Sequence, residues 1–204
     1  MGWIYLGLAL LSAAALAFEI TLTRLFSVTQ WYHFAFLAVS VALLGYGASG
    51  TALSLIPRWA RLPTERRSAA FAILFAVSVL GAYLSLNHLP FDSYRIAWER
   101  NQLLYLLLYY LALTAPFFFS GLVTGMLLAA HTRCAARIYA ANLLGSAVGA
   151  LVPLLVLARV GEGSVLVIAA LGLFAAFTFL LQRSPAKQST TLRSSVLFYQ
   201  TVLL

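Results

Sequence analysis

The residue of this sequence best placed to do chemistry is a single acid in a long apolar stretch. Glu19 lies about 16 residues into the first such stretch, which puts it near the outer third of a helix that rises 1.5 Å per residue. A carboxylate that close to hydrocarbon needs a protein partner, water or a ligand. Structural pairing and a ligand or proton site both stay open, and the candidate partners near the same level are Arg24, His33, His88 and Arg159.

Arg24 is the nearest of these candidates along the chain, but it does not share a face with Glu19. Five residues correspond to about 140° around a helix, whereas side chains three or four apart are neighbours. We therefore expect Glu19 to meet a residue of another helix, with His33 or Arg159 as the first choices.

A second polar group lies on one face of a later apolar stretch. Tyr139, Asn142 and Ser146 recur at i, i+3 and i+7, the spacing of one helix face. Asn142 is too far along the membrane normal to reach Glu19, so the expected role is an interhelical hydrogen bond of about 0.6 kcal/mol. The sequence contains no metal-ligand cluster, no paired catalytic carboxylates and no phosphate-binding loop, and Cys134 is its only cysteine.

The glycines form patterns that resemble functional motifs but have a simpler explanation. The G-x-G-x-x-G of dinucleotide-binding proteins requires a strand before it and a helix after it, and here it lies within an apolar helix. The same segment contains a G-x-S-G, as in rhomboid proteases, but no histidine follows in the last two apolar stretches to act as a base. Small residues let helix backbones approach closely in lipid, so we expect packing roles for Gly45, Gly47, Gly50, Gly121, Gly125, Gly145 and Gly149.

These residues must be positioned by elements that cross a membrane. The chain is 63% hydrophobic and only 9% charged, against about 25% charged in soluble domains. Six stretches have the roughly 20 residues needed to cross a ~30 Å hydrocarbon core, where an uninterrupted segment satisfies its backbone only as a helix. The sequence predicts an all-α bundle with spans at 3–22, 34–56, 68–89, 103–130, 138–158 and 164–181.

The net charge of +8 is explained by its distribution rather than by nucleic acid, because no basic and aromatic binding surface is present. With the N-terminus inside, nine basic residues fall on inside segments and four on outside ones. This bias predicts a multi-pass protein of the inner (plasma) membrane with both termini in the cytoplasm. The inside residues are Arg58, Arg61, Arg66, Arg67, Arg133, Arg137, Arg183, Lys187 and Arg193.

The end of the chain differs from the rest. Residues 1–183 form the predicted membrane domain, and 184–204 contain a polar linker followed by the apolar run 196–204, which is too short to span and is typical of a strand. A lone strand is not stable, so we expect a second domain to begin here. The loop 90–101 mixes aromatic and charged residues, which favours a short helix in the membrane interface.

Three stretches of the membrane domain together resemble the membrane-embedded spermidine synthase-like proteins, which join a helical membrane domain to a polyamine aminopropyltransferase domain. The first is Phe18-Glu19-Ile20-Thr21-Leu22-Thr23-Arg24-Leu25-Phe26-Ser27, followed by Tyr32-His33-Phe34-Ala35-Phe36 and the glycine-rich 43–50. The second is Pro116-Phe117-Phe118-Phe119-Ser120-Gly121. The third is Arg137-Ile138-Tyr139-Ala140-Ala141-Asn142-Leu143-Leu144-Gly145-Ser146-Ala147-Val148-Gly149. The resemblance covers most of residues 1–183.

The tail adds an independent resemblance. Val196-Leu197-Phe198-Tyr199-Gln200-Thr201-Val202 is similar to the first strands of aminopropyltransferases, and this implies that Gln200 lies beside the donor nucleotide pocket. The nucleotide loop and catalytic aspartate of that family have no counterpart here, so this chain cannot transfer an aminopropyl group alone. No cofactor is expected in it, and decarboxylated S-adenosylmethionine would be the donor only if a C-terminal domain exists.

The sequence therefore predicts an integral membrane domain with two alternative functions. As a spermidine synthase-like protein, it would anchor a cytoplasmic enzyme domain or move a small cationic substrate or product, such as a polyamine, with Glu19 as the cation-binding acid. The alternative is a stand-alone small-solute transporter or membrane-assembly subunit without enzymatic activity.

Overall fold

The protein is a bundle of long helices. The computed structural model describes residues 1–29, 35–56, 64–88, 98 and 101–182, and within these it contains six α-helices, two short 3₁₀ turns and no strand. The elements are α1 (Gly2–Thr29), α2 (Ala35–Leu55), α3 (Thr64–His88), α4 (Asn101–Ala130), η3 (Thr132–Cys134), α5 (Ala135–Val160), η4 (Gly161–Gly163) and α6 (Ser164–Leu181). The predicted all-α fold is confirmed.

Each α-helix is long and apolar enough to cross a membrane. The six predicted spans are therefore confirmed, and the chain is a multi-pass membrane protein. Many large apolar side chains are exposed on the bundle, among them Leu144 at 69%, Leu155 at 70% and Phe174 at 63%. On a soluble protein such surfaces would cause aggregation, whereas here they are in contact with lipid tails.

The end of α1 differs from the prediction. Hydropathy placed it at Leu22, but the helix continues to Thr29. The hydroxyls of Thr23 and Ser27 donate hydrogen bonds to backbone carbonyls of their own helix, to Glu19 and Arg24 respectively. The predicted end at Leu22 was too early, because hydropathy falls where polar residues begin whereas the helix continues through them.

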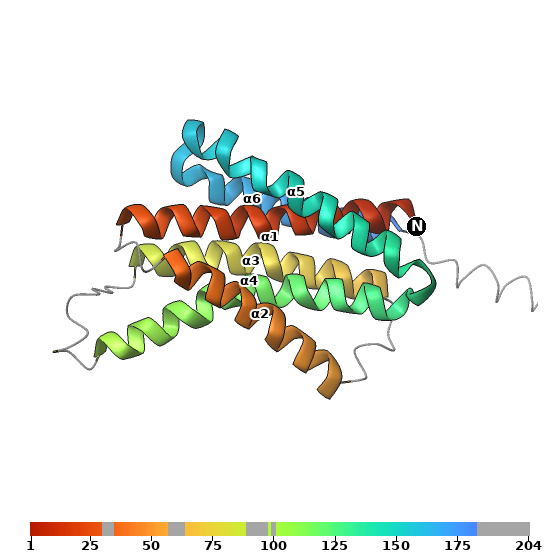
Figure 1. Cartoon of the computed structure of the whole chain (residues 1–204), viewed down its shortest axis with the longest axis horizontal. Coiled ribbons are helices and arrows are strands. Elements are labelled where there is room, and N and C mark those ends of the chain that lie inside the picture. The colour runs from red at the N-terminus through yellow and green to blue at the C-terminus, as the bar shows by residue number, and fades with distance from the viewer. Residues whose placement is uncertain (30–34, 57–63, 89–97, 99–100, 183–204) are drawn as a thin grey trace, which may run out of the picture.

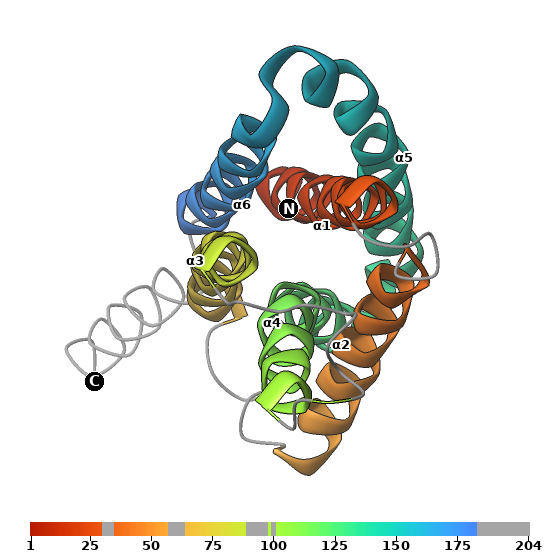
Figure 2. The same ribbon diagram turned by 90° about the vertical axis from the view of Figure 1, so that its left-hand side faces the viewer.

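The bundle is arranged around α1. Figures 1 and 2 show this helix in the middle, and it packs against each of the other five helices. Further close pairs are α2 with α4, α3 with α4 and α3 with α6. The N-terminus and the end of α6 lie together, because the Met1 amine donates a hydrogen bond to Gln182 Oε1 at 3.2 Å.

The residues of α1 explain its central place. Its middle turns carry a run of small side chains, and Ser12, Ala13, Ala14, Ala15 and Ala17 are all at most 4% exposed. Lipid tails give helices no hydrophobic reason to associate, so close contact between backbones is a main source of attraction in the membrane. A helix with small side chains on several faces can make such contacts with several neighbouring helices at once.

Prolines interrupt two of the helices. Pro116 lies inside α4 and Pro153 inside α5. Since proline lacks an N–H and its ring crowds the preceding turn, such positions bend a helix. Figure 1 shows α4 changing direction part-way along its length.

Two predictions concern residues outside the described part of the chain. The predicted second domain at 184–204, including Gln200, lies wholly outside it, and the predicted interface helix at 90–101 lies largely outside it.

Candidate functional site

Glu19 lies deeper in the bundle than the sequence suggested. Because α1 continues to Thr29, ten residues follow Glu19 in the helix, and its Cα lies about 15 Å from that end rather than within one turn of it. The side chain is partly buried. Glu19 therefore belongs to the membrane-spanning part of α1, where an ionisable group is costly unless something compensates its charge.

A tyrosine of α2 connects Glu19 electrostatically with a serine of α4. Tyr46 of α2 lies within electrostatic range of the Glu19 carboxylate, and its phenol is within hydrogen-bonding reach of the Ser120 side chain on α4. Ser120 is 1% exposed, so its hydroxyl is part of the bundle interior. Tyr46 is 40% exposed, which leaves the cluster open on one side. Glu19, Tyr46 and Ser120 thus form a polar cluster where α1, α2 and α4 meet.

Aromatic rings line this polar cluster. Phe18 and Phe117 are both fully buried, and their ring centroids are 5.6 Å apart. The ring of Tyr46 lies 6.1 Å from that of Phe117, so Phe117 contacts both α1 and α2. Gly45 allows this contact, because a Cβ there would lie only 2.6 Å from the Cβ of Phe117. The faces of such rings carry partial negative charge and attract cations.

The partners expected for Glu19 do not converge on it in the described structure. Arg24 is exposed near the end of α1, and His88 is exposed at the end of α3. Arg159 belongs to α5, but its side chain is outside the described part of the structure. His33 as a whole is also outside the described part. Among the described residues, none makes an ion pair or a side-chain hydrogen bond with the Glu19 carboxylate.

Asn142 joins α5 to α1. The Ser12 hydroxyl lies 2.7 Å from Asn142 Oδ1 and 2.8 Å from the backbone oxygen of Leu8, so its one hydrogen is shared between two acceptors. Tyr139 is 54% exposed and Ser146 is partly buried, so these two residues flank the contact without sharing in it. Ser12 and Glu19 are seven residues apart and lie on the same face of α1.

The seven candidate packing glycines fall into two groups. Gly45, Gly121, Gly125, Gly145 and Gly149 each lie against another helix, so closely that a Cβ would meet its atoms at 3.0 Å or less. Gly121 and Gly125 face Ser49 and Leu53 of α2, whereas Gly145 and Gly149 face the backbone of Ala9 and Ala13 of α1. By contrast, Gly47 and Gly50 have no other helix within 4 Å of a Cβ and are exposed on α2.

Two members of the polar cluster were missed in the sequence. Tyr46 and Ser120 lie within the glycine-rich and Pro-Phe stretches, and each stands next to one packing glycine, Gly45 or Gly121. The signal available in the sequence was a polar residue next to a packing glycine.

The described residues contain no group of three or more His, Cys, Asp or Glu side chains able to hold a metal ion.

Comparisons of the chain with protein-family models, with curated proteins and with solved structures found no match.

Proposed function

We propose that this integral membrane protein binds a small organic cation at Glu19 and moves it across the bilayer. The observation that carries the proposal is the carboxylate itself. It belongs to the membrane-spanning helix α1, is partly buried and lies within electrostatic range of the Tyr46 phenol, and no described residue forms an ion pair with it. Intramembrane carboxylates of this kind mark substrate and ion pathways in transporters.

The surroundings of Glu19 favour an ammonium-type cation over a hard metal ion. Calcium and magnesium take about six or more oxygen ligands, and the cluster offers one carboxylate and two hydroxyls. An alkylammonium group instead needs a counter-charge, a few acceptors and aromatic faces. Glu19, Ser120 and the rings of Phe117 and Tyr46 supply these features together.

Equilibrium binding to the purified full-length protein tests this proposal. Calorimetric titration with spermidine and with putrescine should give saturable heat with wild type, and Glu19→Gln should abolish it while the far-ultraviolet circular dichroism stays helical. Glu65→Gln, a matched change at the start of α3, should bind like wild type. Equal binding by wild type and Glu19→Gln would contradict the proposal.

We also propose, on the sequence resemblance, that the chain is the membrane domain of a spermidine synthase-like protein of the inner membrane, with both termini in the cytoplasm. In support, the first two resembling stretches contact each other: Phe18 lies against the ring of Phe117, and Gly45 lies against the Cβ of Phe117. Decarboxylated S-adenosylmethionine would then be the donor used by a further domain. The intact mass of the protein from its native membrane tests this, since a mass far above 22.2 kDa is expected.

The alternative is a stand-alone transporter or membrane-assembly subunit. It predicts an intact mass of 22.2 kDa, and the Glu19 binding experiment then distinguishes a transporter from a purely structural subunit.

A further inference from the structure

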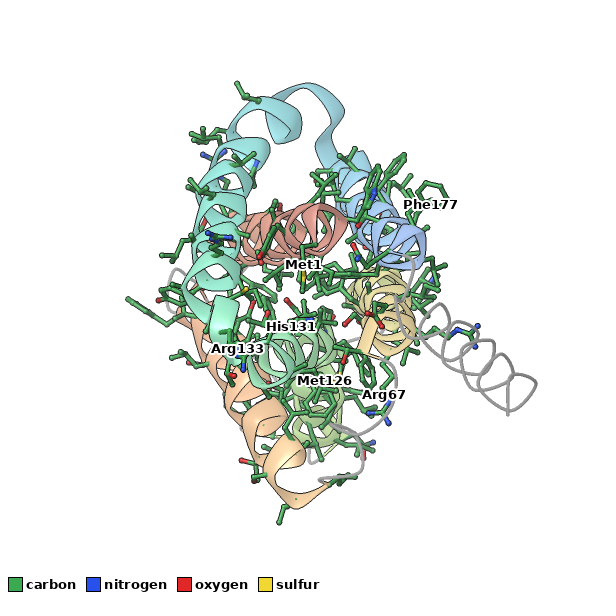
Figure 3. The ribbon with its side chains drawn as sticks, turned by 90° about the vertical axis from the view of Figure 1, so that its right-hand side faces the viewer. Met1, Arg67, Met126, His131, Arg133 and Phe177 are labelled. Carbon is green, nitrogen blue, oxygen red and sulfur yellow. The ribbon has the colours of Figure 1, made fainter. Side chains whose placement is uncertain are left out.

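One end of the bundle gathers exposed arginines. It comprises the start of α3, the end of α4 and the start of α5, together with the N-terminus (Figure 3). Arg66, Arg133 and Arg137 are exposed there, and Glu65 is the one acidic residue among the described residues of this end. This end therefore carries a net positive field that attracts anionic groups.

One of these arginines begins a lipid-facing stripe on α5, and a second lies just before that helix. Arg137, in the first turn of α5, lies on the same face as Leu144, Val148 and Leu151. Arg133 lies four residues earlier along the chain, in the turn η3 that leads into α5. The three apolar side chains are 69%, 59% and 57% exposed. The face is therefore apolar along its length and cationic at its end.

The dimensions of this face match one leaflet of a bilayer. Eleven residues separate Arg137 from Val148, which corresponds to about 16 Å along the helix, close to half of a ~30 Å hydrocarbon core. A phospholipid whose acyl chains lie on Leu144 and Val148 would hold its phosphate at the two guanidinium groups. Guanidinium binds phosphate through paired hydrogen bonds, and each basic residue near a membrane surface adds to the attraction for anionic lipid.

We propose that Arg133 and Arg137, with the apolar face of α5 beyond them, form a binding site for one anionic phospholipid. The site is separate from the Glu19 cluster and does not depend on the proposed cation transport. Its occupant is a lipid rather than a soluble anion, because the arginines and the exposed apolar face are continuous.

Native mass spectrometry of the full chain in detergent tests this site. The protein is titrated with phosphatidylglycerol and with phosphatidylcholine of identical acyl chains. We expect tight retention of one phosphatidylglycerol and little phosphatidylcholine. Arg133→Gln/Arg137→Gln should weaken phosphatidylglycerol binding roughly 25-fold, about fivefold for each arginine.

Three controls separate this site from general attraction and from misfolding. Arg24→Gln/Arg66→Gln removes the same charge elsewhere and should stay within about twofold of wild type, since neither residue lies on this face. Arg133→Lys/Arg137→Lys keeps the charge and should retain most of the binding. If the double glutamine variant aggregates, the single Arg137→Gln should still lose about fivefold.

Three outcomes would overturn the proposal. They are equal binding of the two lipids by wild type, an equal loss in Arg24→Gln/Arg66→Gln, and displacement of the lipid by millimolar inorganic phosphate. The last would show a free-anion site instead of a lipid site.

Discussion

Gly145 of α5 lies against Ala9 of α1 so closely that a Cβ on the glycine would be 2.6 Å from the Cα of Ala9. Gly149 repeats this relationship one turn later against Ala13. The atoms in the way are backbone atoms, which cannot rotate aside as a side chain can. These two contacts therefore set how closely α5 approaches the central helix.

Gly145→Ala should destabilise the protein by about 1–3 kcal/mol, because the added methyl forces two helix backbones apart. Gly47→Ala is the matched control, since its Cβ would meet nothing within 4 Å. The control should be neutral or up to about 1 kcal/mol more stable, because alanine is the better helix former. Thermal unfolding in detergent, followed by circular dichroism, measures both. Equal midpoints for Gly145→Ala and wild type would show that α1 and α5 are less tightly packed than described.

The Ser12–Asn142 hydrogen bond should contribute a small, measurable coupling energy. A double-mutant cycle with Ser12→Ala and Asn142→Ala, measured by unfolding in mixed micelles, is expected to give about 0.6 kcal/mol, the average for such bonds in membrane proteins. The cycle isolates the pair because each single change removes the bond. Strict additivity of the two single variants would mean that the bond contributes nothing.

Phe117 should be among the most sensitive aromatic positions in the bundle. It is fully buried and contacts Phe18, Tyr46 and the backbone beside Gly45. Phe117→Ala should cost about 3 kcal/mol, the lower end for buried phenylalanine, because the lost contacts are packing rather than exclusion of water. Phe177 is the control, since it is 56% exposed on α6, and Phe177→Ala should stay within about 0.5 kcal/mol of wild type. Similar losses in thermal stability for the two variants would contradict the described core.

The single cysteine reports the orientation of the protein in the membrane. Cys134 lies in η3 at the arginine end, and the charge bias predicts that this end faces the cytoplasm. In intact cells it should resist a membrane-impermeant maleimide and should react after permeabilisation. Cys134→Ser/Ser27→Cys moves the thiol to an exposed position at the other end of the bundle and should react in intact cells. The reverse pattern would mean that the predicted orientation is wrong.

The sequence predicted the elements of the fold well because its strongest signal is physical length. An apolar stretch of about 20 residues must be a helix in lipid, whatever its neighbours. The pair Gly145 and Gly149 was also identified correctly as small residues in an apolar helix, and the structure gives both a partner helix. Gly47 and Gly50 have the same local pattern but face outward, because rotation of α2 about its axis is not encoded in a glycine spacing.

The surroundings of Glu19 were harder to predict for two reasons. The end of α1 was placed at Leu22, so Glu19 was assigned to the outer level of the bundle and matched with residues of that level. Tyr46, which lies within electrostatic range of Glu19, is in the middle part of α2, and Ser120, within reach of Tyr46, is in α4. Their placement depends on how those helices cross α1. Such crossing angles arise from packing of all six helices and cannot be obtained from one helix at a time.

The proposed function requires Glu19 to carry a small organic cation through the bundle. Uptake of radiolabelled spermidine into proteoliposomes measures this, with wild type, Glu19→Gln and Glu65→Gln reconstituted at equal density. We expect saturable uptake by wild type and Glu65→Gln, and none above empty liposomes for Glu19→Gln. Uptake by Glu19→Gln at the wild-type rate, or no uptake by wild type, would contradict the proposed function.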